Sequence, residues 1–213
     1  MPLVLMIRHG ENEFVKTGKM AGRLPEVHLN ERGQQQALEL AESLSVIPIK
    51  AVYSSPMERA RETAAPLALK LGLEVQIREG LLETGIGEWA GQELKSLRKL
   101  PAWKTVQDSP SRFRFPSGES FVECQTRLVT EVEAIVKAHK DDEIVACVSH
   151  ADPIKLVAAY YLGMPLDHFQ RLACDTASVT IFMLSEKGTL LVKLNQRPPF
   201  NFPVPEKKGK GKK

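Results

Sequence analysis

A chain of 213 residues is long enough to close around one apolar core, so its length predicts a single domain. The composition, 43% hydrophobic and 26% charged, is that of an ordinary globular protein, and no apolar run approaches the roughly eighteen residues that a membrane span requires. Residues 1–7 are apolar, but they are too few for a secretory leader and lack its basic start. These totals exclude a membrane partner and predict a cytoplasmic protein.

The net charge of +3 originates at the carboxyl end of the chain. Residues 206–213 hold five lysines and one glutamate, and the remainder has 24 basic and 25 acidic residues, which does not favour a nucleic-acid partner. Residues 195–205 contain four prolines, and the run after them is too polar to bury a core. The sequence therefore predicts a domain at 1–195 and a disordered tail at 196–213, rich first in proline and then in lysine and glycine.

Regular elements alternate along the chain. In order, the patterns predict a strand at 3–7, a helix at 31–44, a strand at 51–54, a helix at 57–71, a strand at 74–77, a helix at 120–139, a strand at 143–148, a helix at 152–162, and strands at 178–184 and 190–194. Asn30 and Asp152 are placed to cap two of these helices, and Pro66 is expected to kink or end the second.

Alternating strands and helices indicate an α/β fold, a three-layer sandwich with a mostly parallel central sheet and helices on both faces. In such sheets the ligand crevice lies beyond the carboxyl ends of the strands. The irregular segment 89–118 has two equally weighted interpretations, a cover over this crevice or a surface excursion with its own small core.

The residues after the strand ends can together transfer a phosphoryl group. His9 can act as a nucleophile in its neutral form, and Arg8 with either Arg59 or Arg61 can hold phosphate oxygens. A further donor to the phosphate is available from His150, which lies two residues before the last predicted helix. A general acid is available in Glu83 if its loop folds over the pocket.

Several other reaction types are excluded because the sequence lacks the residues that they need. No HExxH, DxD or Walker pattern is present, so neither a metal site nor a cofactor is predicted. The three cysteines are widely spaced without a CxxC pair, which argues against disulfides and a zinc knuckle. The positions six residues after the cysteines, where a cysteine phosphatase needs arginine, hold Thr130, Pro153 and Thr180.

The order of five motifs resembles the histidine phosphatase superfamily, which contains phosphoglycerate mutases and α-ribazole phosphatases. The resemblance covers the chain from Leu3 to about Leu194. Its motifs are residues 8–11 (the nucleophile motif), 21–23 with 29–37, 54–64, 82–91 (the acid-bearing loop) and 148–151. It implies that the phosphate is bound by Arg59 rather than Arg61, and that the acid is Glu83 rather than Glu88.

Two positions depart from the family pattern. Asn12 stands where Thr is frequent, and Val15 stands where the family has an asparagine that contacts the phosphate. Because Val15 has no side-chain donor, either Asn12 substitutes for that contact or the pocket has one donor fewer. Residues 116–120 are similar to a segment of the phosphatase branches, and the connection from Gly91 lacks the longer insertion of the mutases, which favours a phosphatase.

The resulting hypothesis is a metal-independent phosphatase for a small phosphorylated metabolite, with His9, Glu83 and His150 as catalytic residues. Arg8, Arg59, Asn12 and Arg23 are the predicted substrate-binding residues, Arg23 because it can meet an acidic substrate. A phosphomutase and a non-catalytic phospholigand-binding protein are the two alternatives. The sequence leaves the substrate open, and also the oligomeric state, with a homo-oligomer among the options.

Overall fold

The computed structural model of the chain describes residues 2–185 and 188–200. Its centre is one six-stranded sheet with the order β3-β2-β4-β1-β5-β6. The strands are β1 Leu3–Arg8, β2 Ile49–Ser54, β3 Val75–Ile77, β4 Ile144–Ser149, β5 Val179–Ser185 and β6 Gly188–Gln196. The first four strands pair in parallel, whereas β5 is antiparallel to β1 and to β6. The predicted α/β class and mostly parallel sheet are therefore confirmed.

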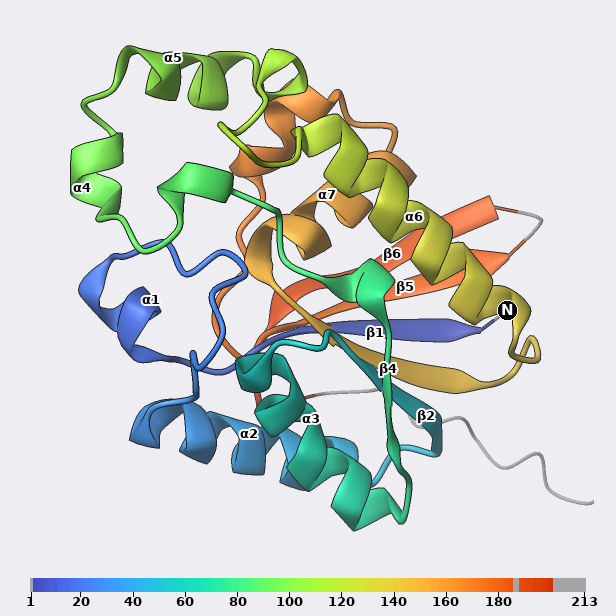
Figure 1. The fold of residues 1–213 in the computed structure, drawn as a ribbon. Coiled ribbons are helices and arrows are strands. Elements are labelled where there is room, and N and C mark those ends of the chain that lie inside the picture. Colours follow the sequence, from blue (N-terminus) through green and yellow to red (C-terminus); the bar gives the residue numbers. More distant parts are fainter. Residues whose placement is uncertain (1, 186–187, 201–213) are drawn as a thin grey trace, which may run out of the picture.

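Helices cover both faces of the sheet (Figure 1). On one face lie α2 (Glu31–Leu44) and α3 (Glu58–Leu71), and on the other α6 (Phe121–Lys137) and α7 (Ala151–Tyr161). Alternate residues of β1 face opposite layers, since Val4 and Met6 pack with α6 and α7 while Leu5 and Ile7 pack with α2 and α3. A strand buried on both faces must be apolar at every position, which explains its unbroken hydrophobic run.

Side-chain caps explain where α2 and α6 begin, and the one at Asn30 was predicted. The Asn30 Oδ1 accepts a hydrogen bond from the Gly33 N–H at 2.9 Å, and α2 spans the predicted residues. Helix α6 begins with a capping box in which Ser120 and Glu123 bond each other's backbone N–H groups. Pro66, in contrast, does not end α3, which continues through it to Leu71. The burial of Leu67 and its neighbours against the sheet outweighs the one backbone hydrogen bond that Pro66 removes.

The start of α7 differs from the prediction. Its N-cap residue is His150, two positions before Asp152, and Pro153 is the third helical residue. Proline is tolerated there because the first N–H groups of a helix have no partner within the helix. The Asp152 carboxylate instead forms an ion pair with Lys155 at 2.7 Å. As a result, His150 stands directly at the amino end of the helix.

The irregular segment 89–118 has features of both predicted roles, a small apolar core and a residue at the cavity. It contains α4 (Leu94–Leu97) and α5 (Pro101–Asp108), which the sequence did not predict, as it also missed α1 (Glu13–Thr17). Its aromatic side chains join the core on the α6 face, where Trp89 lies 5.3 Å from both Phe113 and Phe115 between ring centroids. The segment thus has a small core continuous with that of the domain, and its Leu94 reaches the cavity described below.

The carboxyl end of the described chain lies against the body. Strand β6 ends at Gln196, one residue past the predicted domain boundary, and Phe200 packs against the core beneath α2 and α3. The rest of the predicted tail, 201–213, lies outside the described residues. None of the helices within the described ranges is long and apolar enough to cross a membrane. The three cysteines are free thiols, and Cys124 and Cys147 are buried.

Two glycines bring the loop after β1 into close contact with α2. A Cβ atom added to Gly33 would lie 2.0 Å from the Glu11 carbonyl oxygen, and one added to Gly10 would lie 2.6 Å from the Gly33 carbonyl oxygen. No side chain fits between backbones at these distances. The absence of Cβ atoms therefore allows α2 to pack directly on the loop that carries His9.

We expect Gly33→Ala to lower the free energy of unfolding by about 1–3 kcal/mol, because the added methyl group forces α2 and this loop apart. An alanine in a helix otherwise stabilises it by about 1 kcal/mol relative to glycine. Urea denaturation measures the change. The matched control is Gln34→Ala, on the exposed face of the same helix, with a change within about 0.5 kcal/mol. A Gly33→Ala protein as stable as wild type contradicts the steric argument.

Candidate active site

The pairing of β1 with β4 brings two histidines together. Arg8 lies opposite Ser149 in the parallel ladder, so the residues that follow them, His9 and His150, leave the sheet at the same level. The His9 N–H donates to the Ser149 carbonyl at 3.0 Å. The two rings lie with their centroids 5.2 Å apart in an edge-on arrangement. The predicted strand-end site is therefore formed by neighbouring strands of the sheet.

The geometry of His9 fixes its reactive nitrogen. Its Nδ1 lies 2.7 Å from the Gly10 carbonyl oxygen, which can only accept, so Nδ1 carries the proton and Nε2 carries the lone pair. Burial, together with the charges of Arg59 and Arg8, lowers the pKa of His9 well below its usual value. His9 is 3% exposed and lines a cavity. Near neutral pH it is therefore a neutral imidazole with a free lone pair at Nε2.

Two arginines supply positive charge beside His9. The Arg59 side chain is 1% exposed, and its Nη2 donates to the Gly22 carbonyl at 2.7 Å, while Arg8 Nη1 donates to the Cys174 carbonyl at 2.7 Å. Among the described residues, Arg59 Nε and Nη1 and Arg8 Nε have no hydrogen-bond partner although they are buried. Buried donors without a partner are costly, and both arginines line the cavity. The arrangement suits an anion that accepts these hydrogen bonds.

His150 links the second strand-end loop to the acid-bearing loop. Its Nε2 lies 2.8 Å from Ser55 Oγ, and its Nδ1 lies 3.7 Å from Glu83 Oε2, too far for a hydrogen bond. Burial and the charge of Arg59 lower the pKa of His150 well below its usual value. The contact with Glu83 is thus between a neutral ring and a carboxyl group rather than an ion pair.

The carboxyl group of Glu83 has a strongly raised pKa. Burial first, and then the neighbouring charge of Asp152, raises its pKa from 4.5 to about 7, against the opposing effect of Arg59. Its Oε1 accepts a hydrogen bond from the Thr84 N–H at 2.9 Å. Glu83 also lines the cavity that His9 faces. A carboxyl group with this pKa is part protonated near neutral pH and can both donate and accept a proton.

The cavity has a volume of about 280 Å³ and lies between the strand ends, α1 and the loops around Gly22 and Glu83. Asn12 lines it and is 1% exposed; its Oδ1 accepts from the Val15 N–H at 2.9 Å, which leaves the amide N–H groups for a ligand. The Val15 side chain also lines the cavity. The structure thus places the two departures from the family pattern next to each other, with an available donor only on Asn12.

The other candidates lie away from the cavity. The Arg23 guanidinium donates from Nε to the Glu83 carbonyl at 2.7 Å, and its Nη2 lies 2.7 Å from Glu119 Oε1. The cavity wall contains its neighbours Ala21 and Gly22 but not Arg23. Arg61 is exposed on the surface of α3, and Glu88 accepts a hydrogen bond from Ser117 Oγ. Of the predicted substrate-binding residues, Arg23 is the one that the fold directs toward other protein groups.

Three supporting contacts were not predicted. Ser55 bonds His150, Thr63 Oγ1 accepts from the Gly10 N–H at 2.9 Å, and the Cys174 carbonyl orients Arg8. Ser55 and Thr63 belong to motif 54–64, so their presence in it was the available signal, whereas a backbone carbonyl leaves no signal in a sequence. Within the described residues, no group of three or more His, Cys, Asp or Glu side chains is arranged to hold a metal ion.

We expect Glu83→Gln to be more stable than wild type at pH 8 and equally stable at pH 4. The raised pKa means that the folded protein holds a proton on Glu83 that the unfolded chain releases above pH 4.5. Wild-type stability therefore falls between pH 4.5 and about 7, by on the order of 3 kcal/mol, while glutamine does not titrate. Urea denaturation at both pH values measures this difference, and a pH-independent offset between the proteins contradicts it.

Comparisons with known proteins agree with this geometry. A family model described as histidine phosphatase superfamily (branch 1) matches residues 4–197. Phosphoserine phosphatase 1 of Hydrogenobacter thermophilus is 31% identical over 197 residues, which cover 92% of each chain.

Solved structures extend the comparison. The crystal structure of a phosphoserine phosphatase from Entamoeba histolytica in complex with 3-phosphoglyceric acid is similar with a TM-score of 0.85 and 26% identity, over 93% of this chain and 98% of that one. The α-ribazole phosphatase from Shigella flexneri gives a TM-score of 0.80 at 25% identity, over 92% and 96%. The chain belongs to branch 1 of the histidine phosphatase superfamily and is a phosphatase of that family.

Proposed function

We propose that the protein hydrolyses a phosphate monoester without a metal ion, through a phosphohistidine intermediate on His9. The observation that carries this proposal is the neutral His9, whose Nε2 lone pair is free in a cavity that it shares with Arg8, Arg59 and Glu83. A nucleophile, positive charge for the transferred oxygens and a proton donor are the three requirements of phosphoryl transfer. All three face the same cavity.

In the first step, the His9 Nε2 attacks phosphorus and the bond from phosphorus to the ester oxygen breaks. Glu83 donates its proton to the leaving oxygen, so the product is a neutral alcohol. In the second step, Glu83 takes a proton from water, the water oxygen attacks the phosphoryl group, and inorganic phosphate leaves His9. A pKa of about 7 suits both steps, because the carboxyl group must act first as an acid and then as a base.

Phosphate binding is assigned to Arg8, Arg59, His150 and Asn12. The unpartnered N–H groups of the two arginines and the free amide of Asn12 supply donors toward the cavity. His150 lies just behind the cavity wall formed by His9 and Ala151, and its Nδ1, which has no hydrogen-bond partner among the described residues, is the atom assigned to the phosphate. Asn12 takes over the contact that Val15 cannot make, which removes the only support for a non-catalytic phospholigand-binding protein.

The substrate class follows from the cavity and from the relatives. A volume of about 280 Å³ suits a small metabolite rather than a phosphorylated macromolecule. The related proteins carry names or bound ligands with small phosphorylated molecules, phosphoserine and 3-phosphoglyceric acid. We therefore assign a small phosphorylated metabolite as the substrate of this chain.

We expect His9→Ala to reduce phosphate release from p-nitrophenyl phosphate by at least about 10³-fold, with a chelator present throughout, because no other group replaces the nucleophile. Wild-type protein quenched in alkaline detergent should contain a phosphoryl group that is stable in base and labile in acid, and His9→Ala should contain none.

The matched control is His168→Gln, which changes a histidine outside the cavity and should keep wild-type activity. Full activity of His9→Ala in the presence of the chelator refutes the mechanism. A long-lived phosphoenzyme that passes its phosphoryl group to an added alcohol, rather than to water, favours the mutase alternative.

We expect Glu83→Gln to lower kcat/KM for 2-glycerophosphate by about 10²–10³-fold but to change kcat/KM for p-nitrophenyl phosphate by less than about tenfold. An alkoxide needs a proton to leave, whereas nitrophenolate leaves as an anion. In wild type, kcat/KM for 2-glycerophosphate should fall as pH rises above about 7, when Glu83 ionises. The mutant should lose this dependence. Equal losses for both substrates contradict the acid role.

A further inference from the structure

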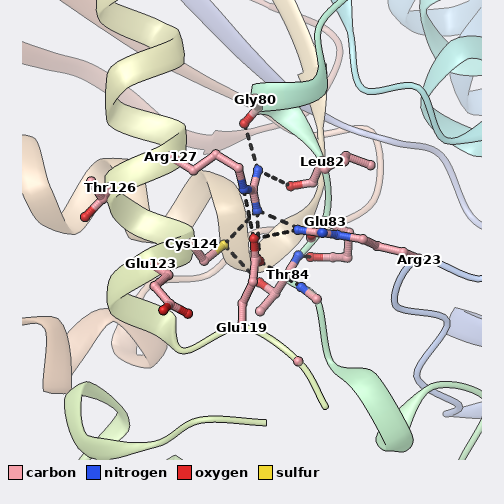
Figure 2. A network of polar contacts seen from close by, with 12 residues as sticks. Arg23, Gly80, Leu82, Glu83, Thr84, Glu119, Glu123, Cys124, Thr126 and Arg127 are labelled. Carbon is pink, nitrogen blue, oxygen red and sulfur yellow. Dashed lines mark hydrogen bonds and ion pairs between the residues drawn. The ribbon is translucent and has the colours of Figure 1, made fainter. Parts of the chain in front are cut away.

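A polar network surrounds the backbone that carries Glu83 (Figure 2). At its centre is Arg127, which extends from α6 toward the segment from Gly80 to Glu83, and beside it lie Glu119 and Arg23. These three side chains are only 20–34% exposed. None of them lines the cavity. Their charges are thus brought together at a partly buried place outside the lining of that cavity.

The network holds consecutive carbonyl groups of the segment. Arg127 Nη1 donates to the Gly80 carbonyl at 2.8 Å and to the Leu82 carbonyl at 3.1 Å. The Leu81 carbonyl between them accepts from Ser149 Oγ at 2.8 Å. The Glu83 carbonyl accepts from Arg23 Nε at 2.7 Å. Four successive carbonyls therefore bond side chains from three other parts of the fold.

This pattern matters because residues 82–86 form neither helix nor strand. A segment without a backbone ladder must satisfy its polar groups in another way, and its conformation depends on the groups that do so. Here those groups are guanidinium N–H donors in a rigid fork, which fixes direction as well as distance. The backbone position of Glu83, and with it the placement of its carboxyl group, is set by Arg127 and Arg23.

Glu119 orients both arginines. Its carboxylate accepts from Arg127 Nε and Nη2 at 3.0 Å each, the two-point geometry typical of strong pairs, and Arg23 Nη2 lies 2.7 Å from Oε1. Glu119 also holds Gly85, two residues after Glu83: its Oε2 accepts from the Gly85 N–H at 2.9 Å, and its own N–H donates to the Gly85 carbonyl at 2.7 Å. The segment 116–120, similar to the phosphatase branches, thus provides the residue that joins the network together.

We propose that Arg127, oriented by Glu119 and assisted by Arg23, is a positioning residue that holds Glu83 where it can protonate the leaving oxygen. The inference rests on the proposed acid role of Glu83. It replaces the prediction that Arg23 binds an acidic substrate with a role behind the catalytic loop. A displacement of about 1 Å in a catalytic group is enough to cost on the order of 10²-fold in rate.

The test uses Arg127→Met, which removes the guanidinium and keeps an unbranched stem. We expect kcat/KM for 2-glycerophosphate to fall about 10- to 100-fold, because this constant reports the step in which Glu83 donates its proton. For p-nitrophenyl phosphate it should change less than threefold, and inhibition by inorganic phosphate should change less than twofold. In the Glu83→Gln background, Arg127→Met should add less than a threefold loss.

A purely structural role gives a different result. It lowers kcat/KM equally for both substrates and multiplies the loss caused by Glu83→Gln, and either outcome overturns the proposal.

The matched control is Arg114→Gln. Arg114 also pairs with a glutamate of α6, Glu123, and donates to the Gly118 carbonyl, but it lies at an exposed site. Its activity on both substrates should stay within twofold of wild type.

Two further variants cover the case in which Arg127→Met does not fold, which circular dichroism reveals. Arg23→Gln and Glu119→Gln are smaller changes and should show the same selective loss for 2-glycerophosphate. If both retain wild-type kcat/KM for it, or if Arg23→Gln instead raises KM alone for both substrates, the positioning role is wrong. The two proposals can be refuted separately. If Glu83→Gln keeps wild-type activity on 2-glycerophosphate, the acid role of Glu83 is wrong. If Glu83→Gln loses this activity but the variants of Arg127, Arg23 and Glu119 keep it, only the positioning role is wrong.

Discussion

The parallel pairing of β1 with β4 is the constraint on which the rest of the site depends. It aligns Arg8 with Ser149, so that His9 and His150 leave the sheet side by side, and the His9 N–H bonds the Ser149 carbonyl. The close contact between Gly33 and the loop after β1 then brings α2 against the segment that carries His9. The two histidines are thus positioned by backbone that the sheet and the start of α7 already fix, as preorganised catalysis requires.

Two features of the site lower the stability of the folded protein. Arg59 is buried with two donors that have no partner among the described residues, and Glu83 is held where burial raises the pKa of its carboxyl group to about 7. Both features cost free energy in the empty protein and are relieved when an anion and a transferred proton are present. The network of Arg127, Glu119 and Arg23 differs, since its charges form ion pairs with one another and it holds a loop without regular structure.

Much of the fold followed from local patterns. The apolar runs that became β1 and β4, the cap at Asn30 and the end of α3 at Leu71 depend on neighbouring residues, so they were predictable. Pro66 and the start of α7 were not, because packing of buried residues and the free first turn of a helix override the local preference. The short helices α1, α4 and α5 were missed, since segments this short have no period that a sequence can display.

The sequence by itself determined the chemistry of this protein: a histidine, arginines and a glutamate follow strand ends in an order that indicates phosphoryl transfer, because residue type and order along the chain are local information. Only the tertiary structure decided the protonation state and the contacts of these groups. It makes His9 neutral with its lone pair at Nε2 and raises the pKa of Glu83 to about 7. It also directs Arg23 to the backbone of Glu83 rather than to the cavity. The physical reason is that burial, charge and hydrogen bonding depend on groups up to 166 positions apart in the chain, as in the bond of Arg8 to the Cys174 carbonyl.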